Sequence, residues 1–515
     1  MAQVSSISSN ATGLKIAEES TPGVLLGTSA DLFQVMEPNS YADFGPEIGT
    51  TPRNPINPSR QRKKGVTTSL SATGGFNTDL TQTNLQSILQ GFLYADHRTK
   101  DELAVTTVNT GGATDDFEPL AGGDGFIAGD LLFAKGFDDA PNNGLHVVSG
   151  TPTATEIIVT TTLTVATTQA GIISKVGHQA GAGDIDVDAS GTLPTLTSTS
   201  FDFTTLGLSG GEYIFLGSDE TDTSFLTAAN NGPKRVRGVP TANVLTIDKS
   251  DLTMVTEAST AETIRIYICR ALKNEADPVL QVTRTYTIER TLGAPDDASP
   301  AQVQADGLIG AYPNELTLNL PPEDKVTLDL GFVALDGLSV DGPTALPSAA
   351  GTLVPIVEAS AFNTSSDFSR IRLATAGSTD EAPTPLFAFV EEITLTINNN
   401  VTANPALSVL GAAVITIGTF EVGGSLTAYY QNQTAADAVR NNDNLTLDFA
   451  LVKENAGIFF DIPLITLGDG RPTVELDTPV KLPLGSEAAT GALIDPSLDH
   501  TLMICFFDYL PLAAE

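Results

Sequence analysis

An internal repeat is the feature that most limits what this chain of 515 residues can fold into. Residues 142–154 read NNGLHVVSGTPTA and residues 230–242 read NNGPKRVRGVPTA, an ungapped match. A short apolar strand pattern precedes each copy, at Gly129–Phe133 and at Gly211–Phe215. Asn-Gly pairs supply backbone positions with φ > 0, which tight turns require, so each copy predicts a small β-module.

The repeat divides the chain into three parts. The modules occupy about 105–195 and 196–275, inserted in a framework to which 1–104 and 276–515 contribute. The turn residues that mark the two modules are Asn142, Asn143, Gly144, Asn230, Asn231 and Gly232. We expect an N-terminal arm, a Pro-rich loop and a first lobe before the modules, and a second lobe after them. Because insertions are tolerated in Gly/Asp-rich turns, the modules are expected to face outward.

Composition and periodicity favour an all-β fold with one or two short helices. Trp is absent, charged residues make up only 17% of the chain, and Thr, Ala, Leu and Gly are the most frequent residues. Strict apolar/polar alternation at 316–320, 326–332, 393–397 and 445–451 predicts half-buried strands. Their polar positions include Thr327, Asp329, Thr446 and Asp448.

Two short helices are predicted, each after a strand that contains a Gly-Gly pair. The first has Leu85, Ile88, Leu89 and Phe92 on one face, with Thr83 as its N-cap. The second covers 434–439. The pairs are Gly74-Gly75 and Gly423-Gly424, and their recurrence indicates two lobes of one duplicated β-fold.

The formal net charge of −36 repels nucleic acid phosphates and anionic lipid. Against that background, one dense basic patch follows three prolines, and it consists of Arg60, Arg62, Lys63 and Lys64. Three interpretations stay open: a solvated loop, a docking element for an acidic surface of a neighbouring copy, and a nucleic-acid contact.

No motif predicts catalysis, a metal or a cofactor. The string around Ser209 lacks the strand-then-helix context of a nucleophile elbow, and the acidic spacing at 184–188 lacks the glycine and glutamate of a calcium loop. The four histidines are dispersed, and Cys269 and Cys505 lie in apolar strand patterns typical of buried thiols. The N-terminal sequence lacks the pattern of a signal peptide, so we expect synthesis in the cytoplasm.

Several segments resemble the tail tube proteins of tailed bacteriophages. The resemblance runs through the basic residues that lead into the first Gly-Gly strand, through 287–332, and through 393–400, 420–429 and 457–463. It implies β-sandwich lobes that close into a ring-shaped β-barrel, with rings stacked into a tube that carries DNA to the host. The repeated modules resemble inserts of some family members.

The resemblance also implies partners and a location. The chain would assemble with itself in the virion tail, together with a tape measure protein and with tail terminator and distal tail proteins. The framework is about twice the length of one tube lobe, which favours trimeric rings of pseudo-sixfold appearance over hexameric ones. Outward modules leave little room for a contractile sheath, which favours a long, siphophage-type tail. The basic patch would reach the adjacent ring, and the four polar strand residues would line the lumen.

Two alternatives remain at this point. One is another β-rich virion or surface protein, such as an adhesin or a decoration protein, built from the same modules. The other is a glycan-processing enzyme on a β-scaffold, which would need paired carboxylates in a groove.

Overall fold

The computed structural model describes residues 9–56, 58–98, 100–111, 114–166, 170–293, 303–356, 359–377, 379–387 and 389–514. Within them the chain consists of β-strands with two short α-helices, which confirms the all-β prediction. A 16-stranded sheet forms the framework, a 12-stranded sheet forms the modules, and β24 (Thr402–Asn404) pairs with β25 (Val414–Thr416). None of these sheets closes into a barrel within the single chain.

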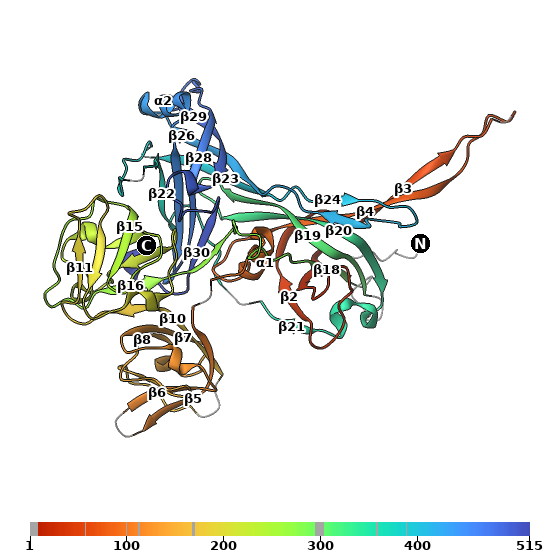
Figure 1. Cartoon of the computed structure of the whole chain (residues 1–515). Coiled ribbons are helices and arrows are strands. Elements are labelled where there is room, and N and C mark those ends of the chain that lie inside the picture. The colour runs from red at the N-terminus through yellow and green to blue at the C-terminus, as the bar shows by residue number, and fades with distance from the viewer. Residues whose placement is uncertain are drawn as a thin grey trace.

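Eight strands of the larger sheet form one continuous curved surface, which we call the tube sheet (Figure 1). In spatial order they are β3 (Pro38–Arg53), β4 (Lys63–Asp79), β20 (Thr327–Asp341), β19 (Gln304–Leu320), β23 (Val390–Asn398), β26 (Glu421–Tyr429), β29 (Lys481–Ala489) and β28 (Ala456–Asp469). Strands β19 and β28 are long enough to leave this surface and to continue into outer layers. Each outer layer covers the apolar face of the tube sheet, which makes two sandwich-like lobes.

The outer layers are built from the remaining strands of the larger sheet. The first lobe has β18 (Tyr286–Gly293), β1 (Gly13–Glu18), β2 (Leu32–Met36) and β21 (Thr352–Val354). The second lobe has β27 (Leu445–Lys453), β22 (Phe368–Thr375), β30 (Met503–Phe507) and β17 (Arg270–Lys273).

The two lobes repeat one topology. In the first, neighbouring strands run β1-β18-β19-β20-β4-β3, and in the second they run β22-β27-β28-β29-β26-β23. The order along the chain is also the same, with a helix after β4 in one lobe and after β26 in the other. β3 is thus the counterpart of β23, and β19 is the counterpart of β28.

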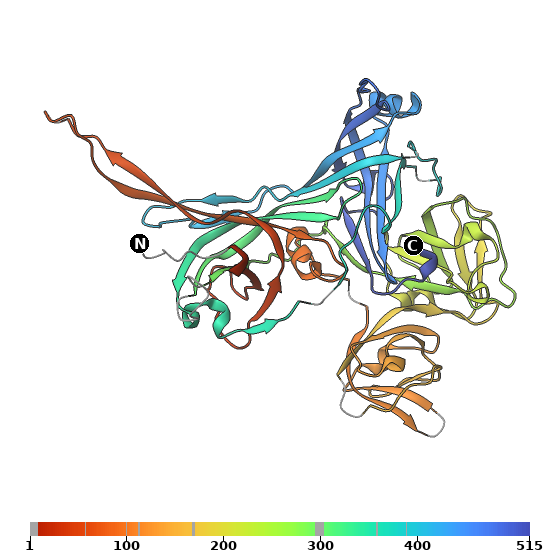
Figure 2. The ribbon, with the colours of Figure 1, turned by 180° about the vertical axis from the view of Figure 1, so that it is seen from behind.

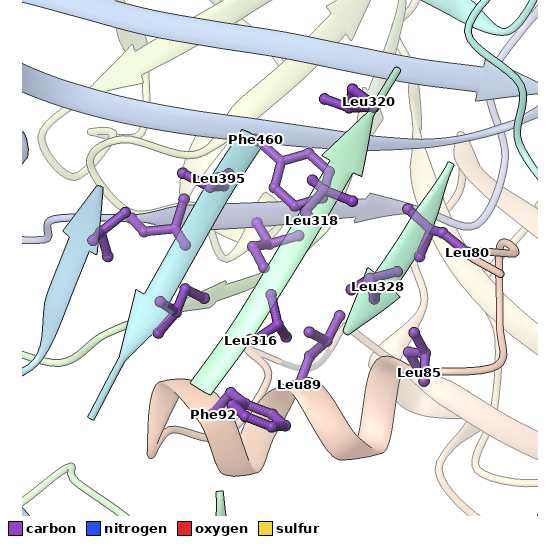
Figure 3. Close-up of a cluster of buried hydrophobic side chains, with 14 of the residues drawn as sticks. Leu80, Leu85, Leu89, Phe92, Leu316, Leu318, Leu320, Leu328, Leu395 and Phe460 are labelled. Atoms are coloured by element: carbon purple, nitrogen blue, oxygen red, sulfur yellow. The ribbon is translucent and has the colours of Figure 1, made fainter. Parts of the chain in front are cut away.

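A leucine-rich core lies between the tube sheet and helix α1 (Gln86–Leu93), as Figure 3 shows. All four predicted helix residues are buried, and Phe92 packs edge-on against Phe332 with ring centroids 5.5 Å apart. The predicted N-cap, Thr83, is wrong. The cap position is Leu85, without a side-chain cap bond, because Asn84 instead closes the preceding turn by accepting from the Thr81 N–H and donating to the Asp79 carbonyl. The second helix is α2 (Thr434–Asn441).

The predicted N-terminal arm is corrected over the described residues. Residues 1–8 lie outside them, but β1 and β2 are integral strands of the first lobe. Leu14 and Ile16 are buried on either side of Lys15, whose ammonium group pairs with Glu289 at 3.0 Å. A strand of six residues gives too few alternations to be recognised in a Ser/Thr/Gly-rich segment.

The two Gly-Gly pairs lie in equivalent strands of the two lobes, but not at equivalent positions within those strands. Gly74 pairs with the core residue Phe332, whereas Gly423 pairs with Thr396 on the polar face. The position that matches Gly74 by orientation is Gly424, opposite Leu395. A shift of one residue exchanges the two faces of a strand, so the sequence match is out of structural register by one.

The 12-stranded sheet carries both modules (Figures 1 and 2). Its strands are β5 (Glu102–Gly111), β6 (Thr114–Pro119), β7 (Asp130–Lys135), β8 (Gly144–Val147), β9 (Ile157–Val159), β10 (Gly171–Gln179), β11 (Ile185–Asp188), β12 (Thr195–Ser198), β13 (Tyr213–Leu216), β14 (Gly232–Arg237), β15 (Val244–Ser250) and β16 (Arg265–Ile268). β10 joins the halves by pairing with β5 and β7 on the one hand and with β16 on the other. The β11–β12 hairpin pairs with β15 and so lies in the second half.

The modules also share a hydrophobic cluster with the second lobe. The cluster contains Tyr213, Phe215 and Tyr267 from the modules, and Phe459 and Cys505 from the lobe. Both cysteines are buried and unpaired, as expected of strand thiols. No helix among the described residues is long and apolar enough to cross a membrane.

Candidate functional site

The uncovered face of the tube sheet is polar, and its residues form rows that run across both lobes. One row follows directly opposed residues from Ser40 through Asn77, Asp329, Thr317, Thr396, Gly423 and Glu487 to Thr466. A second row runs through Asp79, Thr327, Asn319, Thr394, Ser425, Gly485 and Gly468. A third row runs through Ala42, Gly75, Gly331, Glu315, Asn398 and Glu421. The rows contain five carboxylates and neither Lys nor Arg.

Two of the predicted lumen residues, Thr327 and Asp329, lie on this face. Asp329 accepts hydrogen bonds from the side-chain amides of Asn77 and Asn319, each at 2.8 Å. These cross-strand bonds fix the carboxylate in place while it stays exposed to solvent. A shallow concavity of 510 Å³ lies beside it, bordered by Asp43 and Glu315. The face therefore presents fixed negative charge on a curved surface.

The other two predicted lumen residues lie elsewhere. Thr446 and Asp448 on β27 are each only 3% exposed, because the second module covers this face of the second lobe. Asp448 pairs with Lys249 of the module and with Arg370 of the neighbouring strand. Alternation correctly identified a polar face of β27, but that face binds the module rather than solvent. Of the four predicted lumen residues, only Thr327 and Asp329 therefore lie on the open polar face.

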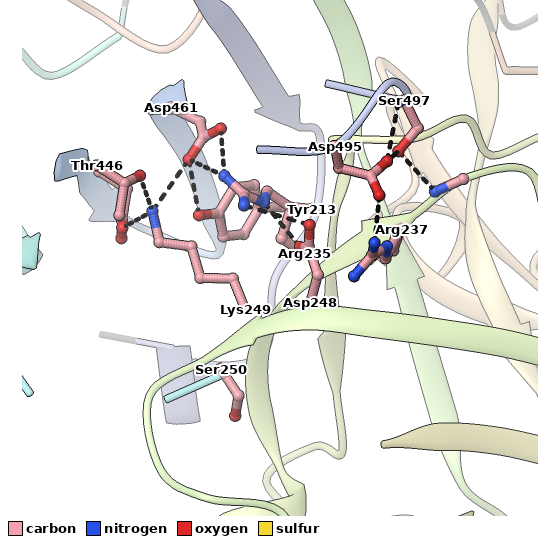
Figure 4. Close-up of polar contacts among 12 residues, drawn as sticks. Tyr213, Arg235, Arg237, Asp248, Lys249, Ser250, Thr446, Asp461, Asp495 and Ser497 are labelled. Carbon is pink, nitrogen blue, oxygen red and sulfur yellow. Dashed lines mark hydrogen bonds and ion pairs between the residues drawn. The ribbon is translucent and has the colours of Figure 1, made fainter. Parts of the chain in front are cut away.

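Around Asp461 a buried ionic network joins the second module to the second lobe (Figure 4). Arg235 donates to Asp248 at 2.8 Å and to Asp461 at 3.0 Å, and the Tyr213 hydroxyl donates to Asp461 at 3.0 Å. The Lys249 ammonium group donates to the Thr446 hydroxyl at 2.8 Å. Charged groups this deeply buried are stable only when they are paired, so the network fixes the module against the lobe.

The network shifts the pKa values of its members. Burial raises the pKa of the Asp461 carboxyl, but Arg235 and Lys249 outweigh this and hold it far below its ordinary value. Burial lowers the pKa of Lys249, against the attraction of Asp448 and Asp461. Burial also lowers the pKa of His500, whose ring lies 3.8 Å from Asp461. The sequence offered one signal of this network, a strand at 232–237 that carries Lys234, Arg235 and Arg237.

The four basic residues of the patch lie at the end of a long hairpin that β3 and β4 form beyond the tube sheet. Arg60, Arg62, Lys63 and Lys64 are all exposed there. Figure 1 shows this hairpin, which we call the basic arm, projecting away from both lobes. Pro46 and Pro52 lie in β3, which is an edge strand and therefore tolerates residues without an N–H donor.

The repeated asparagines have structural roles that are the same in both modules. Asn142 pairs with the backbone of Thr164, accepting from its N–H at 2.7 Å and donating to its carbonyl at 2.9 Å. Asn230 makes the same pair with Val255 at 2.9 Å each. Both side-chain amides are fully buried, and each makes the pair of hydrogen bonds that the backbone of a neighbouring strand would otherwise make. Gly144 and Gly232 follow with φ of 107° and 89°, which explains the glycine in each copy.

The next asparagine of each copy behaves in the same way. Asn143 pairs with the backbone N–H and carbonyl of Phe137, at 3.0 Å and 2.7 Å, and Asn231 with those of Phe225, at 2.9 Å and 2.7 Å. The six repeat residues are therefore explained by folding and do not form a shared binding site.

The residues of the two motifs considered for catalysis and for calcium binding, around Ser209 and at 184–188, make local hydrogen bonds. Ser209 donates to Glu212 at 2.7 Å, and Glu212 is itself paired with Lys100 at 3.3 Å, so the serine belongs to a local hydrogen-bonded turn. Asp184 accepts from Ser198, Asp186 from the Ser259 N–H, and Asp188 from Ser190, so their oxygens do not converge. Among the described residues there is no group of three His, Cys, Asp or Glu side chains that could hold a metal ion.

Comparison with known proteins identifies the framework. No curated protein matches the chain significantly. A family model described as "Phage tail tube protein" matches residues 174–488, which is more than half of the chain. The match begins in β10 and ends in β29, and it spans most of the tube sheet together with the second module. This is a structural family of the virion tail rather than an enzyme family, and the chain belongs to the phage tail tube protein family.

Proposed function

We propose that this protein polymerises as stacked rings of three chains, and that the polar face of the tube sheet lines a channel through which DNA passes to the host. The observation that carries the proposal is the duplicated lobe. Each chain supplies two lobes already joined edge to edge through β19 and β23. Three such chains would present six similar lobes, whereas six chains would present twelve.

The electrostatics of the face suit passage of DNA. Carboxylates such as Asp329, Glu315 and Glu487 repel phosphate groups, and the rows contain no Lys or Arg to hold them. The apolar face is already covered by the outer layers and α1, so only the polar face is free to meet a channel. DNA would thus pass without specific binding.

The basic arm is suited to join successive rings. In a chain of net charge −36, rings repel one another as they approach, and four exposed cations at the end of one arm oppose that repulsion locally. The arm would contact an acidic rim of the adjacent ring.

The modules project from the second lobe on the other side of the protomer from the basic arm (Figures 1 and 2). Bulk of this kind on the outside of the tube favours a long tail without a contractile sheath.

The remaining features of the proposal come from the family. Assembly in the host cytoplasm, a tape measure protein inside the tube, and terminator and distal tail proteins at its ends would complete the tail. The decisive experiment is cryo-electron microscopy of the concentrated purified protein. We expect tubes with an open channel and three chains per ring. Six chains per ring would overturn the trimer, and failure of the protein to form rings or tubes under any assembly condition would overturn the function.

A further inference from the structure

One lysine and two carboxylates meet at the centre of the buried network (Figure 4). Lys249 belongs to β15 of the second module, whereas Asp448 and Asp461 lie directly opposite each other on β27 and β28 of the second lobe. The Lys249 Nζ contacts Asp448 and lies 3.3 Å from the Oδ1 of Asp461. None of the three side chains is more than 4% exposed. An amine of the module therefore faces a pair of carboxylates of the lobe in a site that excludes water.

The two carboxylates differ in their hydrogen bonds. Asp461 accepts from the Tyr213 hydroxyl at 3.0 Å and from Arg235 at 3.0 Å. Both oxygens of Asp448 contact cations, yet neither accepts a hydrogen bond of ordinary geometry, although both are out of contact with solvent. Like charges directly opposite each other on neighbouring strands destabilise the pairing. Losing the charge of one carboxylate would therefore relieve the site, and Asp448 is the one with fewer hydrogen bonds to lose.

We propose that Lys249 and Asp448 are joined by an isopeptide bond, and that Asp461 relays protons during its formation. The bond replaces a buried ammonium group and a buried carboxylate with one neutral amide, which removes the desolvation cost of both charges. It ties the second module to the second lobe covalently. This modification goes beyond the proposed function, because it concerns the attachment of the module and not the channel.

The reaction balances without a further reagent. The ammonium group of Lys249 passes one proton to Asp461, and the neutral amine then attacks the Cγ of Asp448. A C–N bond forms, a C–O bond breaks, and the departing oxygen leaves as water. Two of the three ammonium protons leave with that oxygen, one of them through Asp461, and the third remains on the amide nitrogen. An ammonium group and a carboxylate thus become an amide and a water molecule.

The surroundings favour each part of this reaction. Burial lowers the pKa of Lys249, which makes the neutral amine easier to form. Despite its burial, Asp461 has a pKa held far below its ordinary value by the neighbouring cations, so it is ionised and can accept the proton. The Nε of Arg370 lies 2.6 Å from the second oxygen of Asp448, where it stabilises the negative charge of the tetrahedral intermediate.

Packing and exclusion of water add to these effects. The three side chains are fixed by paired strands, and well-oriented intramolecular reactions reach effective molarities of about 10⁵–10⁸ M. Once the water molecule has left, a buried amide is protected from hydrolysis.

A second buried lysine and aspartate provide an internal control. The Lys175 Nζ lies 2.9 Å from Asp130, and both side chains are buried. Asp130, however, also accepts from the Ile127 N–H at 2.9 Å and contacts His178 at 3.0 Å. Among the described residues, no second carboxylate pairs with Lys175. Proximity alone would predict a bond at both sites, whereas a requirement for a second carboxylate predicts it only at Lys249.

Mass spectrometry of the denatured full-length protein tests the bond. We expect a mass lower than that of the sequence by one water molecule, and a tryptic map in which the peptide with Lys249 is linked to the peptide with Asp448. Lys453 lies between Asp448 and Asp461, so trypsin separates the two candidate aspartates. The peptides with Lys175 and Asp130 should be unlinked.

Variants assign the roles of the residues. Lys249→Met and Asp448→Ala should have the full mass of their sequences, and Asp461→Asn should leave most chains unlinked. The matched control Lys175→Met should keep the loss of one water molecule.

Each outcome decides a separate point. The full sequence mass in the unmodified protein overturns the proposal and identifies the site as an ordinary buried ion pair, and this measurement does not depend on whether any variant folds. A link to Asp461, or a loss of water located elsewhere, overturns the assignment to Asp448. Complete linkage in Asp461→Asn overturns the relay, and a bond between Lys175 and Asp130 overturns the requirement for a second carboxylate. Ring and tube formation is observed by microscopy, so failure of the proposed function would be seen separately.

Discussion

The two lobes share one topology, yet their surfaces have diverged. In the first lobe, β3 and β4 extend into the long basic arm with its four exposed cations. In the second lobe, the corresponding connection holds only the short β24–β25 hairpin, which folds back onto the first lobe through a bond from the Ala412 N–H to the Leu335 carbonyl at 3.3 Å. Its exposed residues include several large apolar side chains, with Leu407 at 97% exposure. The sheet is constrained by its pairing, whereas the connections are free to take different roles.

The lobes differ in the same way in their acidic residues. Asp329 of the first lobe is held by two asparagines in contact with solvent, whereas Asp461 and Asp448 of the second lobe are buried against the module. An exposed carboxylate remains available to a channel. A buried carboxylate instead helps to attach the second module to the second lobe, and its removal carries a much larger energetic cost.

The largest expected effect comes from breaking the buried network of the second lobe. Asp461→Ala removes the buried carboxylate that Arg235 and Lys249 share, leaves the network with excess buried positive charge, and should destabilise the protein by about 3–5 kcal/mol. The comparison variant Asp329→Ala should cost about 0.5–1.5 kcal/mol, since it removes only exposed hydrogen bonds. Urea unfolding of both variants measures the difference. Equal losses of unfolding free energy in the two variants would show that burial of the ionic network does not determine how much it stabilises the protein.

The two modules allow a matched test of the repeated asparagines. Asn142→Ala and Asn230→Ala each remove a fully buried amide together with its hydrogen bonds to a backbone N–H and a backbone carbonyl, and should each cost about 1–3 kcal/mol. Asn404→Ala on exposed β24 is the control and should have little effect. Hydrogen exchange in each module reports the local loss. A large effect in one module only would contradict the equivalence of the two copies.

One part of the pH dependence of the first module follows from His146, and Asp116, whose pKa burial raises to about 6, contributes with the opposite sign. Burial lowers the pKa of this histidine to about 4, so it is neutral when folded and takes up a proton only in the unfolded chain below about pH 6.5. Its contribution to stability is present above pH 6.5 and is lost as the pH falls toward 4, by at most about 1.4 kcal/mol per pH unit. His146→Gln should flatten the dependence in urea midpoints measured from pH 7 to 4.5. An unchanged slope would mean that other groups cause it.

The smallest effect per contact is expected at the basic arm. If the rings stack as proposed, replacing Arg60, Arg62, Lys63 and Lys64 with Gln would remove exposed ion pairs with the adjacent ring worth about 0.2–1 kcal/mol each, so tube yield should fall and lose its dependence on salt. Leu407→Gln in the second hairpin is the comparison and should leave the salt dependence unchanged. Sedimentation of assembled material at several ionic strengths measures both. Unchanged yield and salt response in the four-residue variant would identify the arm as a solvated loop.

Sequence patterns predicted the parts of the fold that depend on neighbours along the chain. The alternation at 316–320 and 393–397, the helix face that ends at Phe92, and the positive φ of Gly144 and Gly232 are all local properties, and each was located correctly. The patterns failed to predict strand β1, because its apolar/polar alternation is too short to recognise. They also failed to predict the N-cap of α1, because that position depends on the turn before the helix.

By itself, then, the sequence determined an all-β chain with two short helices, two repeated modules and strands with one polar face. The tertiary structure decided where those polar faces lie. Thr327 and Thr446 occupy equally polar strand positions, but one faces an open surface and the other binds Lys249 of the module. The pairing of β19 with β23, and the burial of β27 under the module, depend on contacts between residues far apart in the chain. No local pattern encodes them, because alternation shows that a face is polar but not what covers it.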